Sequence, residues 1–404
     1  MNARKQKYNV RLLIISSAIH YLNAGSLSAY GPYVREIDVW ADLFSEVAIA
    51  APLRHLSPPG DCLAFTRTNV VILPQLEVGG DSLTSKIQLL AHLPQLSWNL
   101  ARAIRKYDAV HVRCPGNLGF LGVLLAPLLS RCMVAKYAGQ WNGFPKEPSS
   151  VWLQRRLLGS RYWRGPVTVY GRWPNQLPHV VPFFTSIMTQ EQISHANVIA
   201  RHRGTNGRLN VLFVGRLSAA KNVDTLIEAL SLVKAQGHTF SCSIVGEGPH
   251  RARLEALSTN RGLSTEVQFT GGLAHEIVLR YMERADVLVL ASETEGWPKS
   301  IAEAMAFGVI CIGSNRGFVP EMLADGRGVV VPARDPGRLA QTICEIATAP
   351  QRFEPMRIRA SEWARQFSLE KLRDAVRDLL SLHWNVPVAT LSPKLQADLH
   401  RQLH

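Results

Sequence analysis

Residues 286–314 read DVLVLASETEGWPKSIAEAMAFGVICIGS, a stretch that combines a strand, a turn, a helix and a second strand. The apolar runs at 286–291 and 309–314 have the length of buried strands, and the run that leaves from Ser300 favours a helix. Continuous apolar strands that alternate with helices are typical of a parallel sheet covered on both faces. This stretch therefore predicts an α/β fold.

The turn inside this stretch carries two carboxylates, Glu295 and Glu303, with seven residues between them. Two interpretations stay open. Ser300 and Glu303 fit the S-x-x-E pattern of a capping box, which would leave Glu295 as a solvated turn residue. Alternatively, both carboxylates face a ligand, because open α/β sheets bind ligands at the carboxyl ends of their strands.

The same alternation extends over the whole chain. In the second half, strands are predicted at 209–215, 240–246, 267–271, 286–291, 309–314 and 328–331. In the first half, they are predicted at 10–17, 46–52, 69–74, 109–113, 132–138 and 167–171. The segment 182–208 shows no apolar period and is interpreted as the connection between two domains.

We therefore predict two Rossmann-like, doubly wound α/β domains that face each other across a cleft. The N-terminal domain is expected at 1–183 and the C-terminal domain at 184–365. Residues 366–404, which include the amphipathic stretch LEKLRDAVRDLLSLHW, are expected to form a C-terminal helix and tail that pack back on the N-terminal domain.

The composition indicates a cytoplasmic protein. The six cysteines are scattered without a C-x-x-C pair, so neither a disulfide framework nor a zinc site is predicted. The first apolar run ends without a small-residue cleavage site, so we expect no secretory signal. The apolar stretch 118–135 contains Pro127 and Arg131, and it is interpreted as a helix followed by a strand rather than a membrane span.

The positive charge lies mainly in the first half. Residues 101–172 hold twelve Lys and Arg against two acids, whereas 208–350 hold fourteen against fifteen. Such an excess attracts phosphates of nucleic acid, of anionic lipid or of a pyrophosphate-linked substrate. We recognise no nucleic-acid module and expect no nucleic-acid partner.

A basic and aromatic run, 151–165, leaves a membrane contact open. Its cations are interleaved with Trp152, Tyr162 and Trp163, so it can lie on an anionic membrane surface, with the protein peripheral on the cytoplasmic face. The alternative is an ordinary helix whose aromatic side chains pack inward.

Two loops of the second half carry further candidate residues. Arg216 and Lys221 stand between the first strand and its helix, where two cations beside free N–H groups favour a diphosphate. Exposed loop cations are the alternative. The second strand ends in Gly246, Glu247 and Gly248, a glycine turn that lets a planar ligand approach the backbone.

The ordered combination of Arg-x4-Lys, IVGEGP and Glu-x7-Glu over 208–350 resembles the retaining group-1 (family 4) glycosyltransferases of the GT-B fold. The resemblance implies that Arg216 and Lys221 neutralise the donor diphosphate and the charge of the leaving group. It places Glu295 against the transferred sugar and Glu303 on the ribose hydroxyls.

The rest of the donor site is implied by the same resemblance. The backbone N–H groups of Gly296 and Trp297 would hold sugar hydroxyls or phosphate oxygens, and Ser300 belongs to the same set. No metal is expected, because the Asp-x-Asp of metal-dependent GT-A enzymes is absent from this sequence. No resident cofactor is expected either, because the nucleotide-diphosphate sugar is a co-substrate.

The implied reaction transfers a hexosyl-type sugar from this donor to a hydroxyl of a glycan or lipid-linked acceptor, with retention of configuration, in cell-surface polysaccharide biosynthesis. Two alternatives stay open. One is a nucleotide-sugar epimerase of related two-lobed fold, which would convert the donor without an acceptor. The other is a nucleic-acid-binding protein, which the isoelectric point of 9.8 would suit.

In this family the first half binds the acceptor. Gly25 matches loosely the glycine loop that the family places against the donor phosphates, and Tyr30 follows in the same loop. His111 and Arg113, at a strand end, are predicted on the acceptor side, with a core histidine as the alternative for His111. The histidine that relatives often carry after the strand at 132–138 is missing, because Tyr137 and its neighbours stand there.

Overall fold

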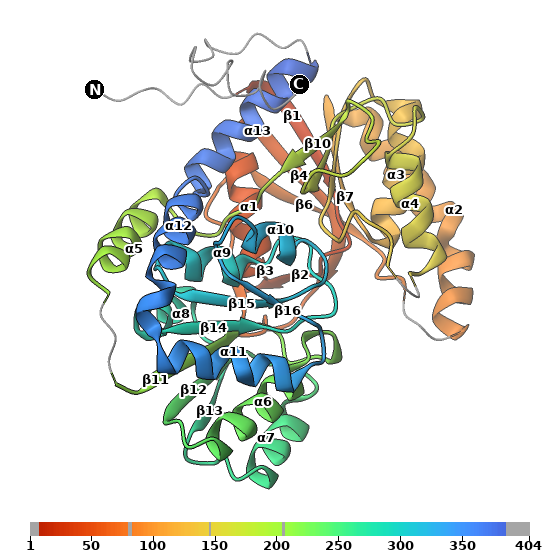
Figure 1. Ribbon diagram of the computed structural model, residues 1–404. Coiled ribbons are helices and arrows are strands. Elements are labelled where there is room, and N and C mark those ends of the chain that lie inside the picture. The colour runs from red at the N-terminus through yellow and green to blue at the C-terminus, as the bar shows by residue number, and fades with distance from the viewer. Residues whose placement is uncertain (1–7, 80–82, 145–146, 204–206, 385–404) are drawn as a thin grey trace. The chain divides into compact units, whose positions relative to one another are not determined.

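The computed structural model describes residues 8–79, 83–144, 147–203 and 207–384. The chain forms two compact units, each built on one sheet with helices packed against it (Figure 1). Unit 1 comprises Met1–Thr185 with Leu369–His404, and unit 2 comprises Ser186–Ser368. The sequence placed these divisions after residues 183 and 365.

Unit 1 contains a ten-stranded mixed sheet with the order β10-β9-β8-β7-β1-β4-β2-β3-β5, in which β6 also pairs with β4. Its strands are β1 (Tyr8–Ile15), β2 (His20–Asn23), β3 (Ser26–Tyr30), β4 (Phe44–Arg54), β5 (Cys62–Ala64), β6 (Val70–Gln75), β7 (Ala109–Cys114), β8 (Cys132–Tyr137), β9 (Val167–Tyr170) and β10 (Val180–Phe183). The six strands predicted for this half are confirmed, and they pair in parallel.

Sequence reasoning missed the antiparallel arm of unit 1. Strands β2 and β3 form a hairpin, and β5 pairs antiparallel with β3. The hairpin turn is Ala24-Gly25, with positive φ at both residues. These strands are short and half polar, so they lack the continuous apolar run that reveals a buried parallel strand.

Helices cover both faces of the unit 1 sheet. They are α1 (Gly31–Ala41), α2 (Leu83–Lys106), α3 (Asn117–Leu129), α4 (Ser149–Leu158) and α13 (Leu369–Trp384). One hydrophobic core contains buried side chains of α2, α3 and α4, and the other contains those of α1 and α13. The predicted packing of the C-terminal helix on the first domain is confirmed, because Leu372, Val376 and Leu380 lie in the second core.

The apolar stretch 118–135 divides as predicted into α3 and β8. Within the described ranges, no helix combines the length and the apolar composition that a membrane crossing needs.

Unit 2 contains six parallel strands in the order β13-β12-β11-β14-β15-β16, all of them predicted. They are β11 (Leu209–Val214), β12 (Phe240–Val245), β13 (Val267–Gly271), β14 (Val287–Leu290), β15 (Ile310–Ser314) and β16 (Val329–Val331). This is the Rossmann-like sheet that the sequence indicates, since the strand order reverses direction at β11 and β14.

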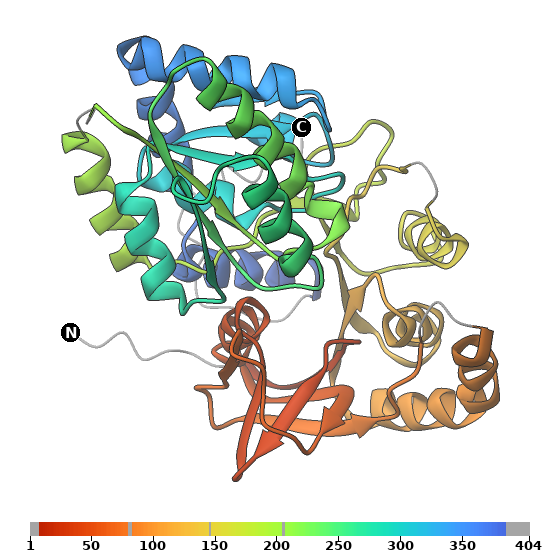
Figure 2. The same ribbon diagram turned by 90° about the horizontal axis from the view of Figure 1, so that it is seen from below.

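The helices of unit 2 form two layers around this sheet (Figure 2). They are α5 (Gln190–His202), α6 (Val223–Ala235), α7 (Arg251–Asn260), α8 (His275–Arg284), α9 (Lys299–Ala306), α10 (Val319–Leu323), α11 (Pro336–Thr348) and α12 (Glu354–Ala364), with 3-10 turns η1 (Ala219–Lys221) and η2 (Pro350–Phe353). Helices α6, α7 and α11 pack together, and α5, α8, α9 and α12 form the other layer.

The segment 182–208, interpreted as the connection between the two domains, contains the division between the units after Thr185. It contains α5, which is capped by Thr189 and Gln192 in a complete capping box. The helix packs on α9 and α12 through Ile193 and Ala196, which are buried. Two buried apolar side chains are too few to produce a visible apolar period in the sequence.

Candidate functional site

The predicted donor-site residues of unit 2 lie on loops and at the start of helix α9, at one edge of its sheet. All strands of this sheet run parallel, so the loops after β11, β12, β13 and β14 meet at the carboxyl ends of the strands. This edge is the usual ligand-binding place of an open α/β sheet. The structure therefore gathers at one edge residues that are as much as 87 positions apart in the sequence, from Arg216 to Glu303.

Lys221 and Glu295 form the central contact of this site. Lys221 Nζ contacts Glu295 Oε1, and the two side chains are 24% and 10% exposed. Lys221 ends the turn η1 after β11, and Glu295 lies in the loop between β14 and α9. A phosphate that approaches Lys221 would compete with Glu295 for the ammonium group, so the two predicted roles are physically coupled.

Arg216 lies in the same loop as Lys221, two residues after β11. Its side chain is exposed, and we find no ion-pair partner for it among the residues that the structure describes. An exposed guanidinium without an ion-pair partner keeps its five N–H donors available for a phosphate.

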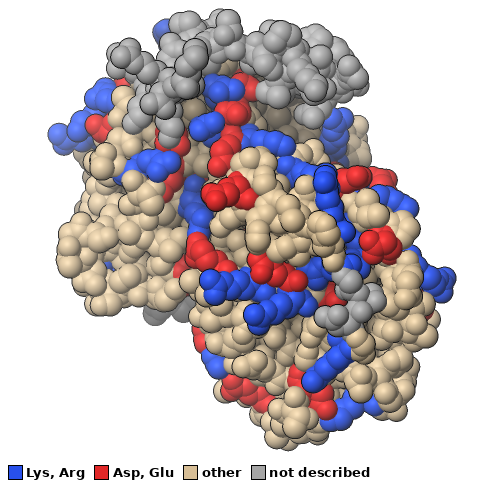
Figure 3. Space-filling model, turned by 90° about the vertical axis from the view of Figure 1, so that its left-hand side faces the viewer, with Lys and Arg blue, Asp and Glu red and all other residues tan. Residues whose placement is uncertain are grey.

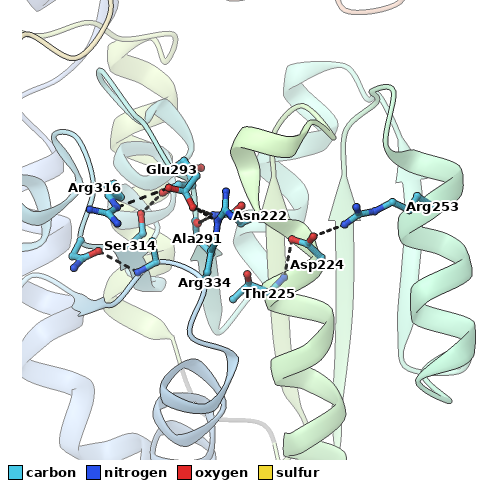
Figure 4. Close-up of polar contacts among 12 residues, drawn as sticks. Asn222, Asp224, Thr225, Arg253, Ala291, Glu293, Ser314, Arg316 and Arg334 are labelled. Atoms are coloured by element: carbon cyan, nitrogen blue, oxygen red, sulfur yellow. Dashed lines mark hydrogen bonds and ion pairs between the residues drawn. The ribbon is translucent and has the colours of Figure 1, made fainter. Parts of the chain in front are cut away.

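Asn222 and Glu293 tie the Lys221 loop to the Glu295 loop (Figure 4). Asn222 is in the left-handed conformation with φ of 45°, and its Nδ2 donates to Ala291 O at 3.0 Å and to Glu293 Oε1 at 2.9 Å. The Glu293 backbone N–H donates to Ala220 O at 2.8 Å. These bonds fix the relative positions of Lys221 and Glu295.

Glu293 also pairs with two arginines from the following loops. Arg334 contacts Glu293 Oε1, and Arg316 Nε lies 3.9 Å from Oε2 (Figure 4). The hydrogen bond from Asn222 and the contact with Arg334 hold the pKa of Glu293 below its ordinary value. Glu293 is therefore a charged anchor that holds several loops of this edge together.

The glycines after β12 are needed because two loops touch through their backbones. Gly246 has φ of 142°, and a Cβ there would lie 1.9 Å from Gly215 O. A Cβ at Gly248 would lie 2.3 Å from Leu217 O. This contact explains both glycines without a ligand, so their assignment to donor binding stays a prediction.

Glu247 lies between the two glycines, and its backbone O accepts a hydrogen bond from Leu217 N at 2.9 Å. Its side chain is 56% exposed and pairs with Arg251 of α7. Its role in donor binding also stays a prediction.

The capping box predicted at Ser300 and Glu303 is wrong. Helix α9 begins at Lys299 after Pro298 as N-cap, without a side-chain cap, and Ser300 is already its second residue. Glu303 instead points to α8, where its Oε1 lies 3.3 Å from His275 Nε2. The two side chains are 6% and 11% exposed, so Glu303 is a nearly buried carboxylate whose observed partner is a histidine.

Trp297 belongs to an aromatic cluster. Its ring stacks on Phe318 at 5.4 Å and on Trp363 at 6.0 Å, and its edge faces Phe367 at 4.9 Å. The side chain of Trp297 is thus a packing element that fixes the backbone between Gly296 and α9. The backbone role predicted for Gly296 and Trp297 stays a prediction.

Across the described ranges, no group of three or more His, Cys, Asp or Glu side chains is placed to hold a metal ion. The cations that the sequence predicts for a diphosphate at this edge are Arg216 and Lys221, and this role stays a prediction.

The predicted residues of unit 1 lie on two parts of its sheet, the β2–β3 hairpin and strand β7. Gly25 is the second residue of the hairpin turn between β2 and β3, with φ of 78°. Tyr30 ends β3 with 52% of its surface exposed. The roles proposed for both residues stay predictions.

His111 does not line a ligand site, and its assignment to the acceptor side is wrong. Its exposed fraction is 0%, and its ring stacks on Trp40 with 4.2 Å between centroids. Burial holds its pKa well below the ordinary value, because the charged imidazolium would lose its hydration. The alternative interpretation, a core histidine, is confirmed as to burial, but neither ring nitrogen has a hydrogen-bond partner among the described residues.

Arg113 belongs to a buried ion network that sequence reasoning missed. Glu36 of α1 accepts from Arg113 Nη1 at 2.6 Å and pairs with Lys136 Nζ at 2.8 Å. Burial alone would raise the pKa of Glu36, but Arg113 and Lys136 hold it well below its ordinary value. The side chain of Arg113 is 13% exposed and held by this network, so its role on the acceptor side stays a prediction.

Three further residues of the site were missed, namely Asn222, His275 and Glu293. His275 follows the predicted strand 267–271 closely, and a polar residue after a parallel strand is a recognisable signal. Asn222 directly follows Lys221 in the sequence, and Glu293 lies two residues before Glu295. No local pattern in the sequence reveals that they bond to each other, because 71 positions separate them.

Comparison with known proteins identifies this part of the chain. Residues 198–367 match the family model described as glycosyl transferases group 1. These residues form a group 1 glycosyltransferase domain. The match includes Arg216, Lys221, Glu295 and Glu303, so the resemblance noted from the sequence is confirmed at the level of this family.

Curated relatives are also glycosyltransferases. A GDP-mannose-dependent alpha-(1-6)-phosphatidylinositol monomannoside mannosyltransferase of Mycolicibacterium smegmatis is 26% identical over 67% of this chain and 76% of its own. An amylovoran biosynthesis glycosyltransferase of Erwinia amylovora is 31% identical, and a putative colanic acid biosynthesis glycosyltransferase of Escherichia coli is 34% identical. The last two matches span 34% and 33% of this chain and only 36% and 35% of those relatives.

Solved structures share the fold of both units. A sucrose-phosphate synthase of Thermosynechococcus elongatus has a TM-score of 0.68 with 20% identity, over 92% of this chain and 98% of that one. Anabaena HepE in complex with UDP and glucose has a TM-score of 0.64 with 16% identity, over 93% and 100%. These neighbours are GT-B glycosyltransferases, and the fold is GT-B. None of these comparisons favours an epimerase or a nucleic-acid-binding protein.

Proposed function

We propose that this protein transfers a sugar from a nucleoside-diphosphate sugar to a hydroxyl of a glycan or lipid-linked acceptor, with retention of configuration. The observation that carries the proposal is the joint position of Arg216, Lys221, Glu295 and Glu303 at one sheet edge of the group 1 domain. The mannosyltransferase relative acts on a phosphatidylinositol monomannoside, and two other relatives act in amylovoran and colanic acid biosynthesis. They support a glycan or lipid-linked acceptor and a place in cell-surface polysaccharide biosynthesis.

In this proposal, Arg216 and Lys221 bind the diphosphate and stabilise the charge that develops on the leaving group. Preorganised cations act most strongly in this role when water is partly excluded, as it is around Lys221. Glu303 accepts hydrogen bonds from the ribose hydroxyls. Glu295, held by Lys221 before the donor arrives, is released to the hydroxyls of the transferred sugar when the diphosphate takes the ammonium group.

Binding of the donor is tested by thermal shift with UDP, GDP, ADP and dTDP. A ligand that binds only the folded state raises the melting temperature, so one of these should give a concentration-dependent increase. The matching sugar nucleotides are then incubated with lipid-linked oligosaccharides, and the product is analysed by mass spectrometry and by anomeric NMR. Absence of a shift with all four nucleotides, or a product of inverted configuration, would contradict the proposal.

We further propose that the reaction needs neither a metal ion nor a resident cofactor. The support is the pair of cations beside the expected diphosphate, which supply the charge that a divalent ion supplies in metal-dependent enzymes. Activity should therefore survive excess EDTA. Complete loss with EDTA and recovery with Mn²⁺ or Mg²⁺ would overturn this assignment.

A peripheral contact of unit 1 with an anionic membrane is a second proposal, and the helices α2 and α4 support it. Large apolar side chains on their outer surfaces are exposed, namely Ile87, Leu90, Trp98, Trp152 and Leu153. Exposed cations flank them, namely Arg102, Arg105, Lys106, Arg156 and Arg161. Apolar side chains with surrounding cations are the composition of a surface that inserts among anionic headgroups.

The basic run 151–165 contributes only in part to this surface. Trp163 is 1% exposed and belongs to the core, whereas Trp152 is 46% exposed, and the Arg156 guanidinium lies over its ring. On the face that includes α5 and α12, basic and acidic side chains lie next to one another (Figure 3).

A further inference from the structure

Glu303 and His275 form a nearly buried pair at the carboxyl edge of the unit 2 sheet. His275 opens α8 after β13, and Glu303 lies in the second turn of α9. His275 Nε2 lies 3.3 Å from Glu303 Oε1, and the side chains are 11% and 6% exposed. Among the described residues, His275 Nδ1 is buried without a hydrogen-bond partner.

The chemistry of the pair fixes the proton on the imidazole. An ionised carboxylate only accepts hydrogen bonds, so Nε2 must be the nitrogen that carries a proton and donates. A buried carboxylate without such a donor would lose its hydration without compensation. His275 therefore holds Oε1 of Glu303 through a hydrogen bond and restricts the rotation of this side chain.

This restriction matters because Glu303 must meet two neighbouring hydroxyls. A glutamate side chain has three rotatable bonds, and fixing them on binding costs conformational entropy. A carboxylate whose Oε1 is already held by His275 has lost this freedom before the nucleotide arrives. Preorganisation of this kind increases affinity without adding a contact to the ligand.

We propose that His275 is a positioning residue for nucleotide recognition, which orients the Glu303 carboxylate toward the ribose hydroxyls. The inference rests on the proposed function, and specifically on the ribose contact of Glu303. It extends that function to a residue on a different helix, which the sequence motifs do not include. His275 itself needs no contact with the nucleotide in this role.

The experiment compares affinities for a ribonucleotide and its deoxy form. The probes are UDP and dUDP, or GDP and dGDP, whichever ribonucleotide raises the melting temperature more, and dissociation constants are measured by calorimetry. The dUDP or dGDP probe lacks the 2′-hydroxyl, so the ratio of the two constants reports the contact between Glu303 and the ribose. We expect the wild type to bind the deoxy form roughly tenfold more weakly, which is about 1.4 kcal/mol.

Two variants of similar size separate positioning from packing. His275→Leu fills the volume without a donor, so the ratio should fall to about threefold or less and ribonucleotide affinity should drop roughly fivefold or more. His275→Gln keeps an N–H donor near the position of Nε2 and should restore most of the ratio. If His275→Leu melts below the assay temperature, His275→Ala replaces it.

The control is a second histidine–glutamate pair in the same unit. His195 Nε2 lies 2.9 Å from Glu283 Oε1 between α5 and α8, at an exposed place. His195→Leu should therefore leave both constants unchanged. A folded His275→Leu with the wild-type ratio would overturn the positioning role and leave the ribose contact intact. If the wild type binds the ribonucleotide and its deoxy form equally well, Glu303 does not contact the 2′-hydroxyl of the ribose. The positioning role of His275 is then overturned as well.

Discussion

Substitutions of single carboxylates at the candidate site should separate nucleotide binding from catalysis. Glu303 and Glu295 have the same chemistry, but they differ in their partners and in their proposed targets. Glu303 is held by the imidazole of His275 on α8, whereas Glu295 is held by the ammonium group of Lys221. Two isosteric substitutions should therefore give different defects.

Glu303→Gln should weaken the binding of the nucleoside diphosphate. The amide keeps one acceptor oxygen but loses the charge that strengthens the hydrogen bonds, typically at a cost of about 1–3 kcal/mol. The dissociation constant should rise roughly tenfold or more in calorimetry. Glu295→Gln should keep nucleotide affinity and reduce the transfer rate, because its proposed partner is the sugar. Wild-type affinity and turnover in both folded variants would refute the donor-site assignment.

Glu36 gives a residue-scale prediction for stability. Glu36→Gln leaves Arg113 and Lys136 in the interior without their carboxylate, and breaking a buried pair in this way costs about 3–5 kcal/mol. The free energy of unfolding at pH 7 is measured by urea denaturation. Glu77→Gln is the control, because the Glu77 pair with Arg54 is 46% and 39% exposed and should contribute about 1 kcal/mol or less.

The same network predicts how stability depends on pH. The pKa of Glu36 is lower in the folded protein than its ordinary value of 4.5, so the unfolded chain takes up the proton first as the pH falls. The stability that Glu36 contributes is complete above that value and is lost progressively below it. Stability of the wild type should therefore decrease more steeply below pH 4.5 than that of Glu36→Gln. Parallel curves for the two proteins would contradict this assignment.

Helices and strands could be predicted where the residues of the segment itself determine its secondary structure. The parallel strands of both units were found because each is a continuous apolar run, and the division of 118–135 was found because Pro127 lies near the end of a helix. Helix α5 was missed because its stability depends on packing against α9 and α12, although T-x-x-Q at Thr189 was a visible capping signal. The S-x-x-E pattern at Ser300 had the same form and was not a cap.

Candidate site residues could be predicted where they belong to an ordered motif. Arg216, Lys221, Glu295 and Glu303 follow the strand ends at fixed spacing, so the sequence places them at one edge. The contacts between loops depend on pairs such as Asn222 and Glu293, and their distance in the chain hides them. His111 misled us because a histidine near a strand end has the same sequence pattern in a core as in a site.

The loop after β12 gives an element-scale prediction. Gly246→Ala would place a Cβ 1.9 Å from Gly215 O, so the two loops must separate. Gly262 is a matched control, since its φ of 68° is also positive but nothing lies within 4 Å of its Cβ position. Gly262→Ala should cost about 1 kcal/mol from backbone strain alone. Gly246→Ala should cost clearly more and also weaken nucleotide binding. Equal losses of melting temperature in the two variants would contradict the close contact.

At the scale of the whole molecule, charge and apolar surface are distributed unequally between the units. Residues 208–350, which lie in unit 2, are nearly neutral, and many of their charges form ion pairs. The basic excess of 101–172 lies in unit 1, where α2 and α4 also expose their apolar side chains. A lipid-linked acceptor would be reached most readily by a protein that carries such a surface.

Cosedimentation with vesicles tests this distribution. The protein should pellet with phosphatidylglycerol vesicles at low salt and be released as salt increases, because screening shortens the reach of the cations. Leu90→Gln with Trp98→Gln removes two exposed apolar side chains of α2 and should weaken partitioning by roughly tenfold or more. Leu232→Gln is the control, since Leu232 is 43% exposed on α6 of unit 2. Equal binding to neutral phosphatidylcholine vesicles would exclude an electrostatic contact. Equal partitioning of the α2 variant and the wild type would exclude α2 from the membrane surface.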